Sequence, residues 1–238
     1  MLRALGLVPA RGGSKRIERK NLALLGGRTL VRRALKTAVA AGCFEVVALS
    51  SEDPEILAEA RGLPVLAVER PAALATDTAR SFDVVLDALR AAEAEHGRGR
   101  FEAVAVVQAT SPFTTPEDLA GTVALLDSSG AGSAVSIARV ESAVHPLKLK
   151  RLEGDRLVPF LEDDAMTPSH ELPELWLRNG SVYVSRREVL DAGTFIAEDV
   201  RGYPMPAERS YDVDTPLDLA FAEFLVERGS GERGSGPG

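Results

Sequence analysis

A glycine-rich basic loop is the first place in this chain where residue types and spacing could do chemistry. It runs over 9–21, directly after an apolar segment, and holds the adjacent glycines Gly12 and Gly13. Paired glycines let a backbone approach an anion closely, and clustered cations supply charge to bind it. The spacing matches neither the Walker A loop nor the dinucleotide fingerprint. The loop predicts a phosphate site, against the alternative of a solvated basic loop; its cations are Arg11, Lys15, Arg16, Arg19 and Lys20.

A second loop, over 70–81, is rich in alanine and threonine and lies between an expected strand and an expected helix. Its backbone groups and hydroxyls suit hydrogen bonding to the edge of a base. The plainer alternative is an ordinary surface loop that ends in a Ser81 helix cap.

A third segment contains two alternating carboxylates, Asp212 and Asp214. In extended backbone these side chains point the same way, and two such carboxylates can hold a hard divalent cation with water in its remaining positions. Asp218 follows Thr215 by three residues, which favours a structural role in a capping arrangement.

These segments require a scaffold, and the hydrophobic pattern predicts one. Continuous apolar runs without inside/outside alternation are separated by single amphipathic helices, which is typical of a parallel sheet covered on both faces. We expect an α/β fold, a three-layer sandwich with a mostly parallel sheet, whose ligands bind at the carboxyl ends of the strands. The expected strands are 4–8, 46–50, 64–68, 103–107 and 177–184. The expected helices are 30–39, 54–61, one from 82 up to a break at 97–100, one opened by 115–118, and 216–228.

One segment interrupts this alternation of strands and helices. Residues 142–175 are charged and punctuated by proline, so we interpret them as an excursion, a small dimerisation arm, within one domain over 1–228. The Gly/Ser-rich end, 229–238, is expected to be a disordered tail.

Charge and composition narrow the classes of partner. The net charge of -7 opposes binding to nucleic acid or to an anionic membrane, so a polyanionic ligand would need a local basic cluster. Cys43 is the single cysteine, which excludes an internal disulfide and favours a reducing compartment. With no apolar run long enough for a signal peptide or a membrane span, the expected location is the cytoplasm.

The ordered set of motifs resembles the acylneuraminate cytidylyltransferases, the CMP-sialic acid synthetases and their relatives, over nearly the whole chain. No single motif would be specific, but their order is. The matching segments are 9–15, 19–21, 70–81, Gln108 with 110–112, 145–148, 172–173, 179–180 with Tyr183, and 212–215.

The resemblance implies a fold like that of the nucleotide-diphospho-sugar transferases and a role for each motif residue. A CTP-dependent enzyme of this kind uses Mg²⁺ as cofactor, and an acceptor oxygen attacks the α-phosphorus in line, without a covalent intermediate. The implied catalytic residues are Arg11, Lys20, Asp212 and Asp214, the last two also holding the metal. The implied nucleotide ligands are Arg11, Gly12, Gly13, Ser14, Lys15, Lys20, Asn21, Arg70, Ala79 and Ser81, with Arg70 and the backbone around Ala79 reading cytosine.

The acceptor is where the chain departs from the family pattern. Sialic acid members carry arginines where this chain has 169–171 and Leu177, and a bidentate guanidinium is the best partner for an acceptor carboxylate. A sialic-like nonulosonic acid and a phosphonate therefore both remain open as the small anionic acceptor. The candidate acceptor contacts are Gln108, Lys148, His170 and Arg178.

Two other functions compete with this interpretation. One is a nucleotidyltransferase that uses another nucleoside triphosphate and a sugar phosphate or cofactor precursor. The other is a catalytically silent nucleotide-binding protein, against which the joint presence of the basic loop and of Asp212 with Asp214 speaks. The aperiodic excursion over 142–175 and the resemblance together predict a homodimer.

Overall fold

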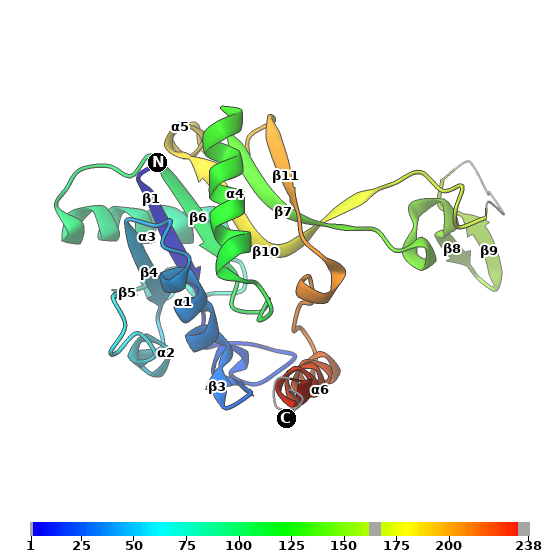
Figure 1. The fold of residues 1–238 in the computed structure, drawn as a ribbon, viewed down its shortest axis with the longest axis horizontal. Helices are drawn as coiled ribbons and strands as arrows, with labels where there is room; N and C mark the ends of the chain where they lie inside the picture. The colour runs from blue at the N-terminus through cyan, green and yellow to red at the C-terminus, as the bar shows by residue number, and fades with distance from the viewer. Residues whose placement is uncertain (1, 162–167, 233–238) are drawn as a thin grey trace, which may run out of the picture.

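The computed structural model describes residues 2–161 and 168–232, with side chains as far as 228. A seven-stranded sheet forms its centre (Figure 1). Four of its pairings are parallel, and one long strand, β10, runs antiparallel to both neighbours. In spatial order the strands are β11 (Val200–Pro204), β7 (Ser133–Arg139), β10 (Trp176–Arg186), β6 (Ala103–Val107), β1 (Ala4–Pro9), β4 (Val46–Ser51) and β5 (Val65–Glu69).

Helices cover both faces of this sheet, which confirms the predicted three-layer α/β sandwich. One buried cluster joins the sheet to α1, α2 and α4, and a second joins its other face to α3 and α5. A third packs α6 against a small hairpin, β2 with β3. The elements are α1 (Leu30–Ala40), α2 (Pro54–Ala58), α3 (Ser81–His96), α4 (Pro116–Ser129), α5 (Arg187–Asp191), α6 (Pro216–Glu232), β2 (Leu24–Leu25) and β3 (Arg28–Thr29).

The central strands are buried because their sequences are apolar throughout. β1 and β6 consist almost entirely of fully buried residues, and they pair in parallel from Ala4 with Ala103 to Leu7 with Val106. Such burial on both faces is expected of strands in the middle of a covered parallel sheet. The helix α4 starts sharply because Thr115 and Asp118 form a reciprocal capping box, with proline at the first helical position.

The excursion is an arm that extends away from the sandwich (Figure 1). It leaves the sheet after β7, returns at β10, and contains two single-turn helices and an antiparallel hairpin. Residues 162–167 within it lie outside the described part of the chain. Its elements are η3 (Ser142–Val144), η4 (Pro146–Lys148), β8 (Lys150–Glu153) and β9 (Arg156–Pro159).

The C-terminal boundary differs from the expectation. The last helix does not stop at residue 228 but continues to Glu232, so the first residues of the expected tail are helical. The remainder of that predicted tail, 233–238, lies outside the described residues. Between residues 2 and 232, leaving out the gap at 162–167, the search for a helix long and apolar enough to cross a membrane finds none.

Candidate active site

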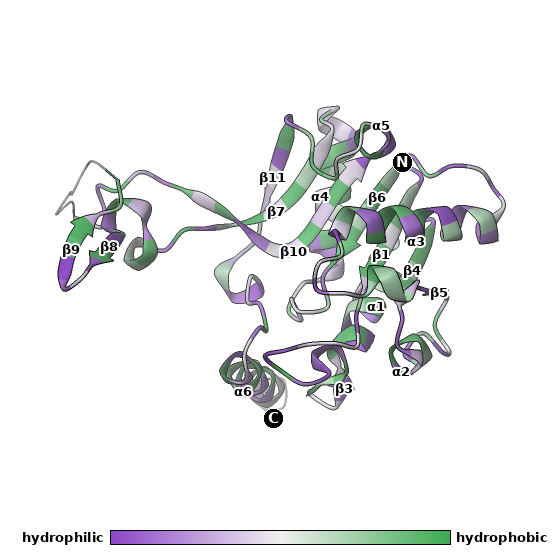
Figure 2. Cartoon of the chain, turned by 180° about the vertical axis from the view of Figure 1, so that it is seen from behind, coloured by the Kyte–Doolittle hydropathy of each residue, from purple (hydrophilic) through white to green (hydrophobic). Residues whose placement is uncertain are grey.

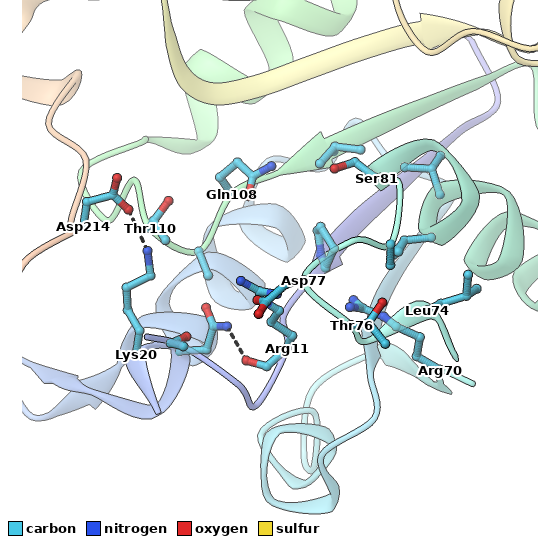
Figure 3. A pocket seen from close by; sticks show the side chains of 18 of the residues that line it. Arg11, Lys20, Arg70, Leu74, Thr76, Asp77, Ser81, Gln108, Thr110 and Asp214 are labelled. Atoms are coloured by element: carbon cyan, nitrogen blue, oxygen red, sulfur yellow. Dashed lines mark hydrogen bonds and ion pairs between the residues drawn. The ribbon is translucent and has the colours of Figure 1, made fainter. Parts of the chain in front are cut away.

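A cleft of about 750 Å³ opens at the carboxyl ends of the strands, where an α/β sheet is expected to bind ligands. Its walls come from the basic loop after β1, the loop between β5 and α3, the end of β6 and the segment before α6 (Figure 3). Most of the residues selected from the sequence lie in this cleft. They are Arg11, Ser14, Lys15, Lys20, Asn21, Arg70, Ala79, Ser81, Gln108 and Asp214.

The two glycines of the basic loop do not line the cleft. The Gly12 N–H points behind the loop and donates to Oε1 of Glu52 at 2.8 Å. A Cβ atom on Gly12 would lie 2.7 Å from Oδ2 of Asp53, so glycine is required for the loop to pack against the turn after β4. Asn21 fixes the same loop by donating from Nδ2 to the Arg11 carbonyl at 2.9 Å. The backbone is therefore anchored from behind while charged side chains of the loop line the cleft.

Lys20 of the basic loop and Asp214 of the segment before α6 form an ion pair at one side of the cleft (Figure 3). The Lys20 ammonium donates to Oδ1 of Asp214 at 2.9 Å, and Nη2 of Arg16 lies 3.0 Å from Oδ2. The hydrogen bond from Lys20 is the main cause that holds the pKa of Asp214 below its ordinary value, and Arg16 adds to it.

Asp77 forms a similar bridge on the other side. Its Oδ1 accepts from Nη1 of Arg11 at 2.8 Å, and its Oδ2 lies 2.7 Å from Nζ of Lys15. These partners, Lys15 first and then Arg11, lower the pKa of Asp77. Sequence reasoning did not single out this residue. The sequence signal that could have identified Asp77 is an acidic residue in the 70–81 loop, which was expected at the same edge of the sheet as the basic loop.

Arg70 is a buried cation at the floor of the cleft. Its side chain is held by Ser50, to which Nε donates at the hydroxyl (3.2 Å) and Nη2 at the carbonyl (2.8 Å). Burial lowers the pKa of Arg70, and the nearby carboxylates of Glu52 and Asp87 oppose this. A guanidinium fixed in this way presents its remaining donors in a defined direction.

The candidate metal residues flank a buried anchor. Val213 is fully buried and donates its N–H to the Thr110 carbonyl at 2.8 Å. Of its two neighbours, Asp214 lines the cleft, whereas Asp212 is exposed and is not among the lining residues. Partial loss of solvation raises the pKa of the Asp212 carboxyl above its ordinary value, and a hydrogen bond with Thr110 opposes this increase.

Asp218 has the structural role that its spacing indicates. Its Oδ2 accepts from the N–H of Thr215 at 2.7 Å and from that of Asp214 at 3.0 Å, at the start of α6. The Asp218 N–H in turn donates to the Thr215 hydroxyl oxygen at 3.3 Å. This capping arrangement fixes the backbone that carries Asp214.

An apolar wall faces Gln108 at the inner end of the cleft, and sequence reasoning missed most of it. Tyr183 of β10 pairs with Val106 of β6, and the loop before β11 adds Phe195 and Ile196. That loop is held by buried hydroxyls, because Ser133 lies 2.9 Å from Ser185 and also accepts the Ala197 N–H at 2.9 Å. Ser185 donates to the Phe195 carbonyl. No periodic pattern marks this loop in the sequence.

Three predicted acceptor contacts lie outside the cleft of their own chain. Lys148 and His170 are on the arm, where Lys148 donates to the Ser169 hydroxyl at 3.1 Å and His170 lies 3.5 Å from Glu171. Arg178 is exposed on β10 at the root of the arm. The cleft of one chain therefore does not contain these three residues.

A cationic cleft at the carboxyl edge of a covered, mostly parallel sheet is typical of an α/β enzyme that binds a phosphorylated ligand. The family model for cytidylyltransferases matches residues 5–225, so the chain belongs to the cytidylyltransferase family.

Several curated relatives align with most of the chain. The CMP-N,N'-diacetyllegionaminic acid synthase of Legionella pneumophila is 30% identical over 95% of this chain and 97% of its own length. The pseudaminic acid cytidylyltransferase of Campylobacter jejuni is 26% identical over 95% and 97%. The N-acylneuraminate cytidylyltransferase A of Danio rerio is 30% identical over 93% of this chain but only 50% of its own length.

The fold also resembles a solved structure, the CMP:2-keto-3-deoxy-manno-octonic acid synthetase complexed with CTP. The match has a TM-score of 0.70 and covers 95% of this chain and 99% of the other, at 18% identity. This likeness confirms a fold of the nucleotide-diphospho-sugar transferase type.

Proposed function

We propose that this cytidylyltransferase transfers CMP from CTP to a sialic-like nonulosonic acid and releases pyrophosphate. The observation that carries the proposal is the cleft itself. Arg11, Lys15 and Lys20 line it together, in a protein whose net charge of -7 would otherwise repel a triphosphate. The relatives named above act, by their names, on legionaminic, pseudaminic and acylneuraminic acids, which supports this class of acceptor.

The transfer forms one bond and breaks one. An acceptor hydroxyl oxygen attacks the α-phosphorus of CTP, the bond from that phosphorus to the β-phosphate oxygen breaks, and the hydroxyl proton leaves to solvent. Negative charge grows on the departing pyrophosphate, and cations already in place stabilise it without reorganisation. Arg11, Lys15 and Lys20 have the position to do this.

Base selection would fall to Arg70, which the family resemblance also indicates. Cytosine presents acceptors at O2 and N3, whereas uracil carries a proton at N3, so a fixed guanidinium favours cytosine. Ser50 provides that fixation by accepting two hydrogen bonds from Arg70. The Ala79 N–H, by contrast, donates to the Thr76 carbonyl at 3.2 Å.

Asp212 and Asp214 fit a site for Mg²⁺. This ion commonly uses one or two carboxylates and completes its shell with water and substrate phosphates. Asp214, which lines the cleft, and Asp212, which is exposed two residues before it, would supply such a donor set. Within the described ranges, no group of three or more acidic, histidine or cysteine side chains offers a metal cage. When bound, the ion would neutralise phosphate charge.

The acceptor end of the cleft combines a polar and an apolar side. Gln108 can donate and accept hydrogen bonds, and Tyr183, Phe195 and Ile196 present apolar surface opposite the cations. A carbon skeleton larger than a phosphonate, such as that of a nonulosonic acid, would use this wall. Because three predicted cationic contacts lie elsewhere, a phosphonate remains an outcome of the substrate test below.

A homodimer forms part of the proposal. The arm exposes many large apolar side chains, and a monomer would leave them in water. In Figure 2 the ribbon of the arm has the hydrophobic colour along part of β9. The exposed residues are Val144, Leu149, Leu152, Leu157, Phe160, Leu161, Trp176 and Leu177. Light scattering that finds only a 25 kDa species would contradict this dimer.

The decisive experiment measures pyrophosphate release with each nucleoside triphosphate against a panel of nonulosonic acids and phosphonates. We expect turnover with CTP and Mg²⁺ and with a nonulosonic acid. Preference for GTP or UTP, or turnover only with a phosphonate, would contradict the proposal. Stabilisation by CTP without any turnover would instead indicate a silent nucleotide-binding protein.

Variants link that activity to the cleft. Arg11→Ala and Lys20→Ala should each lower kcat/KM for CTP at least about a hundredfold, since each removes a phosphate contact in the transition state. Arg28→Ala is the matched control, because Arg28 is exposed on β3 and does not line the cleft. Undiminished turnover in the first two variants would show that the triphosphate binds elsewhere.

A further inference from the structure

All five cations of the basic loop already have carboxylate partners within the chain. Asp77 serves Arg11 and Lys15, and Asp214 serves Arg16 and Lys20. The fifth, Arg19, pairs outside the cleft lining with Asp53 and Glu55. A triphosphate that enters the cleft must therefore displace or rearrange existing ion pairs.

Asp77 bridges two cations as a bound phosphate would, and so does Asp214, but Asp77 is not one of the candidate metal residues. One of its oxygens contacts Arg11 at 2.8 Å and the other contacts Lys15 at 2.7 Å. It reaches them from the facing loop, 66 residues after Arg11 and 62 after Lys15, and it lines the same cleft (Figure 3). Half of the Asp77 side chain remains exposed, so it can turn away into water.

We propose that Asp77 is an internal counterion that competes with pyrophosphate for Arg11 and Lys15 and so speeds the release of this product. The inference rests on the proposed function, in which these two cations hold the leaving end of CTP. Asp77 would be a specificity-determining residue for the phosphate end of the cleft, and it would disfavour ligands held by phosphate contacts alone.

The physical reason is the difference between substrate and product. Before transfer, the triphosphate is covalently linked to cytidine, so contacts of the base and sugar help to hold it against Asp77. After transfer that link is broken, and pyrophosphate is held only by its own contacts. A tethered carboxylate then has a high effective concentration at the vacated cations, because its loop is fixed at both ends by Arg70 and α3.

The test measures binding of inorganic pyrophosphate by calorimetry, first without divalent metal and then with Mg²⁺. Asp77→Asn keeps the size of the side chain and removes its charge, so pyrophosphate should bind about fivefold to tenfold more tightly. Its inhibition constant as a product should fall by the same factor. Asp77→Glu, which restores the charge, should return both values toward wild type.

A matched control is Asp83→Asn, the same charge change in the first turn of α3 and outside the cleft lining. It should leave pyrophosphate binding unchanged, and the effect of Asp77→Asn should shrink in high salt because the pairs are exposed. Unchanged or weaker pyrophosphate binding in Asp77→Asn would overturn the inference. If Asp77→Asn weakened pyrophosphate binding only in the presence of Mg²⁺, this result would show that Asp77 helps to bind the metal and would also overturn the inference.

Arg11→Ala separates failure of this inference from failure of the proposed function. If Arg11→Ala weakens pyrophosphate binding while Asp77→Asn does not strengthen it, the phosphate site stands and the counterion role falls. If Arg11→Ala binds pyrophosphate as wild type does, the phosphate site itself is misplaced, and both proposals fall together.

Discussion

Arg209 donates two parallel hydrogen bonds to the carboxylate of Asp118, at 2.9 Å from Nε and 2.8 Å from Nη2, and Asp118 is fully buried. Asp118 also caps α4 by accepting from the Thr115 N–H at 3.0 Å. The pair ties the start of α4 to the segment that carries Asp212 and Asp214. A buried carboxylate is stable only when it is paired and hydrogen-bonded in this way.

Removal of this pairing should destabilise the protein. Arg209→Ala leaves the Asp118 carboxylate buried with fewer partners, so we expect the free energy of unfolding to fall by about 2 to 4 kcal/mol. Arg209→Lys keeps the charge but loses the bidentate geometry, so its free energy of unfolding should lie between those of wild type and Arg209→Ala. Urea denaturation measures both. Equal stability of all three proteins would show that the segment is held by other contacts.

Acid should weaken the same pairing in a defined range. Burial raises the pKa of Asp118, but hydrogen bonds from Arg209 and Thr115 outweigh it and leave the pKa below its ordinary value. The unfolded state therefore binds this proton first, and the stabilisation is complete above pH about 3.9 and is lost as the pH falls through the folded-state pKa. Denaturation between pH 5 and about 3 should be less pH-dependent in Asp118→Asn than in wild type. An identical slope in the two proteins would contradict this assignment.

Cys43 should react slowly with thiol reagents. Burial raises the pKa of this thiol to about 11, so only about one molecule in a thousand carries a thiolate at pH 8. A disulfide reagent should label the native protein far more slowly than the urea-unfolded protein. Rapid native labelling at pH 8 would mean that the end of α1 opens readily.

The buried serine pair should tune the acceptor end of the cleft. Ser133 accepts the Ala197 N–H and contacts Ser185, so Ser133→Ala frees the loop that carries Phe195 and Ile196. We expect KM for the acceptor to rise about threefold to tenfold, while KM for CTP changes less than twofold. Steady-state kinetics with each substrate varied in turn makes the comparison. Equal increases for both substrates would indicate a general loss of stability instead.

The sequence predicted the central strands well because β1, β4 and β6 are nearly uninterrupted apolar runs. It did not predict β7, whose Ser133 and Ser136 are buried and satisfied by Ser185 and Asn179 from a strand far along the chain. Cross-strand partners of this kind make polar residues compatible with a core, and a local pattern cannot reveal them. The edge strand β11 is short and mostly exposed, so it also lacked a hydrophobic signal.

The site was predicted by residue type more successfully than by geometry. Composition located the cations of the basic loop. It also suggested that Gly12 faces a bound phosphate, whereas the Gly12 N–H donates to the carboxylate of Glu52 within the protein. The backbone of this loop is left-handed instead at Arg19, with a φ of 49°, where Asp53 and Glu55 hold the side chain. Asp77 was overlooked because its partners are 62 and 66 residues away, at Lys15 and Arg11.

The hydrogen bond between Lys20 and Asp214 spans 194 residues of sequence. During synthesis the ribosome would expose the basic loop early, yet the opposing wall of the cleft would emerge only near the end of translation. A growing chain would thus pair Arg11 and Lys15 with Asp77 before Asp214 is available to Lys20, and competence for turnover would arise only when the last helix docks.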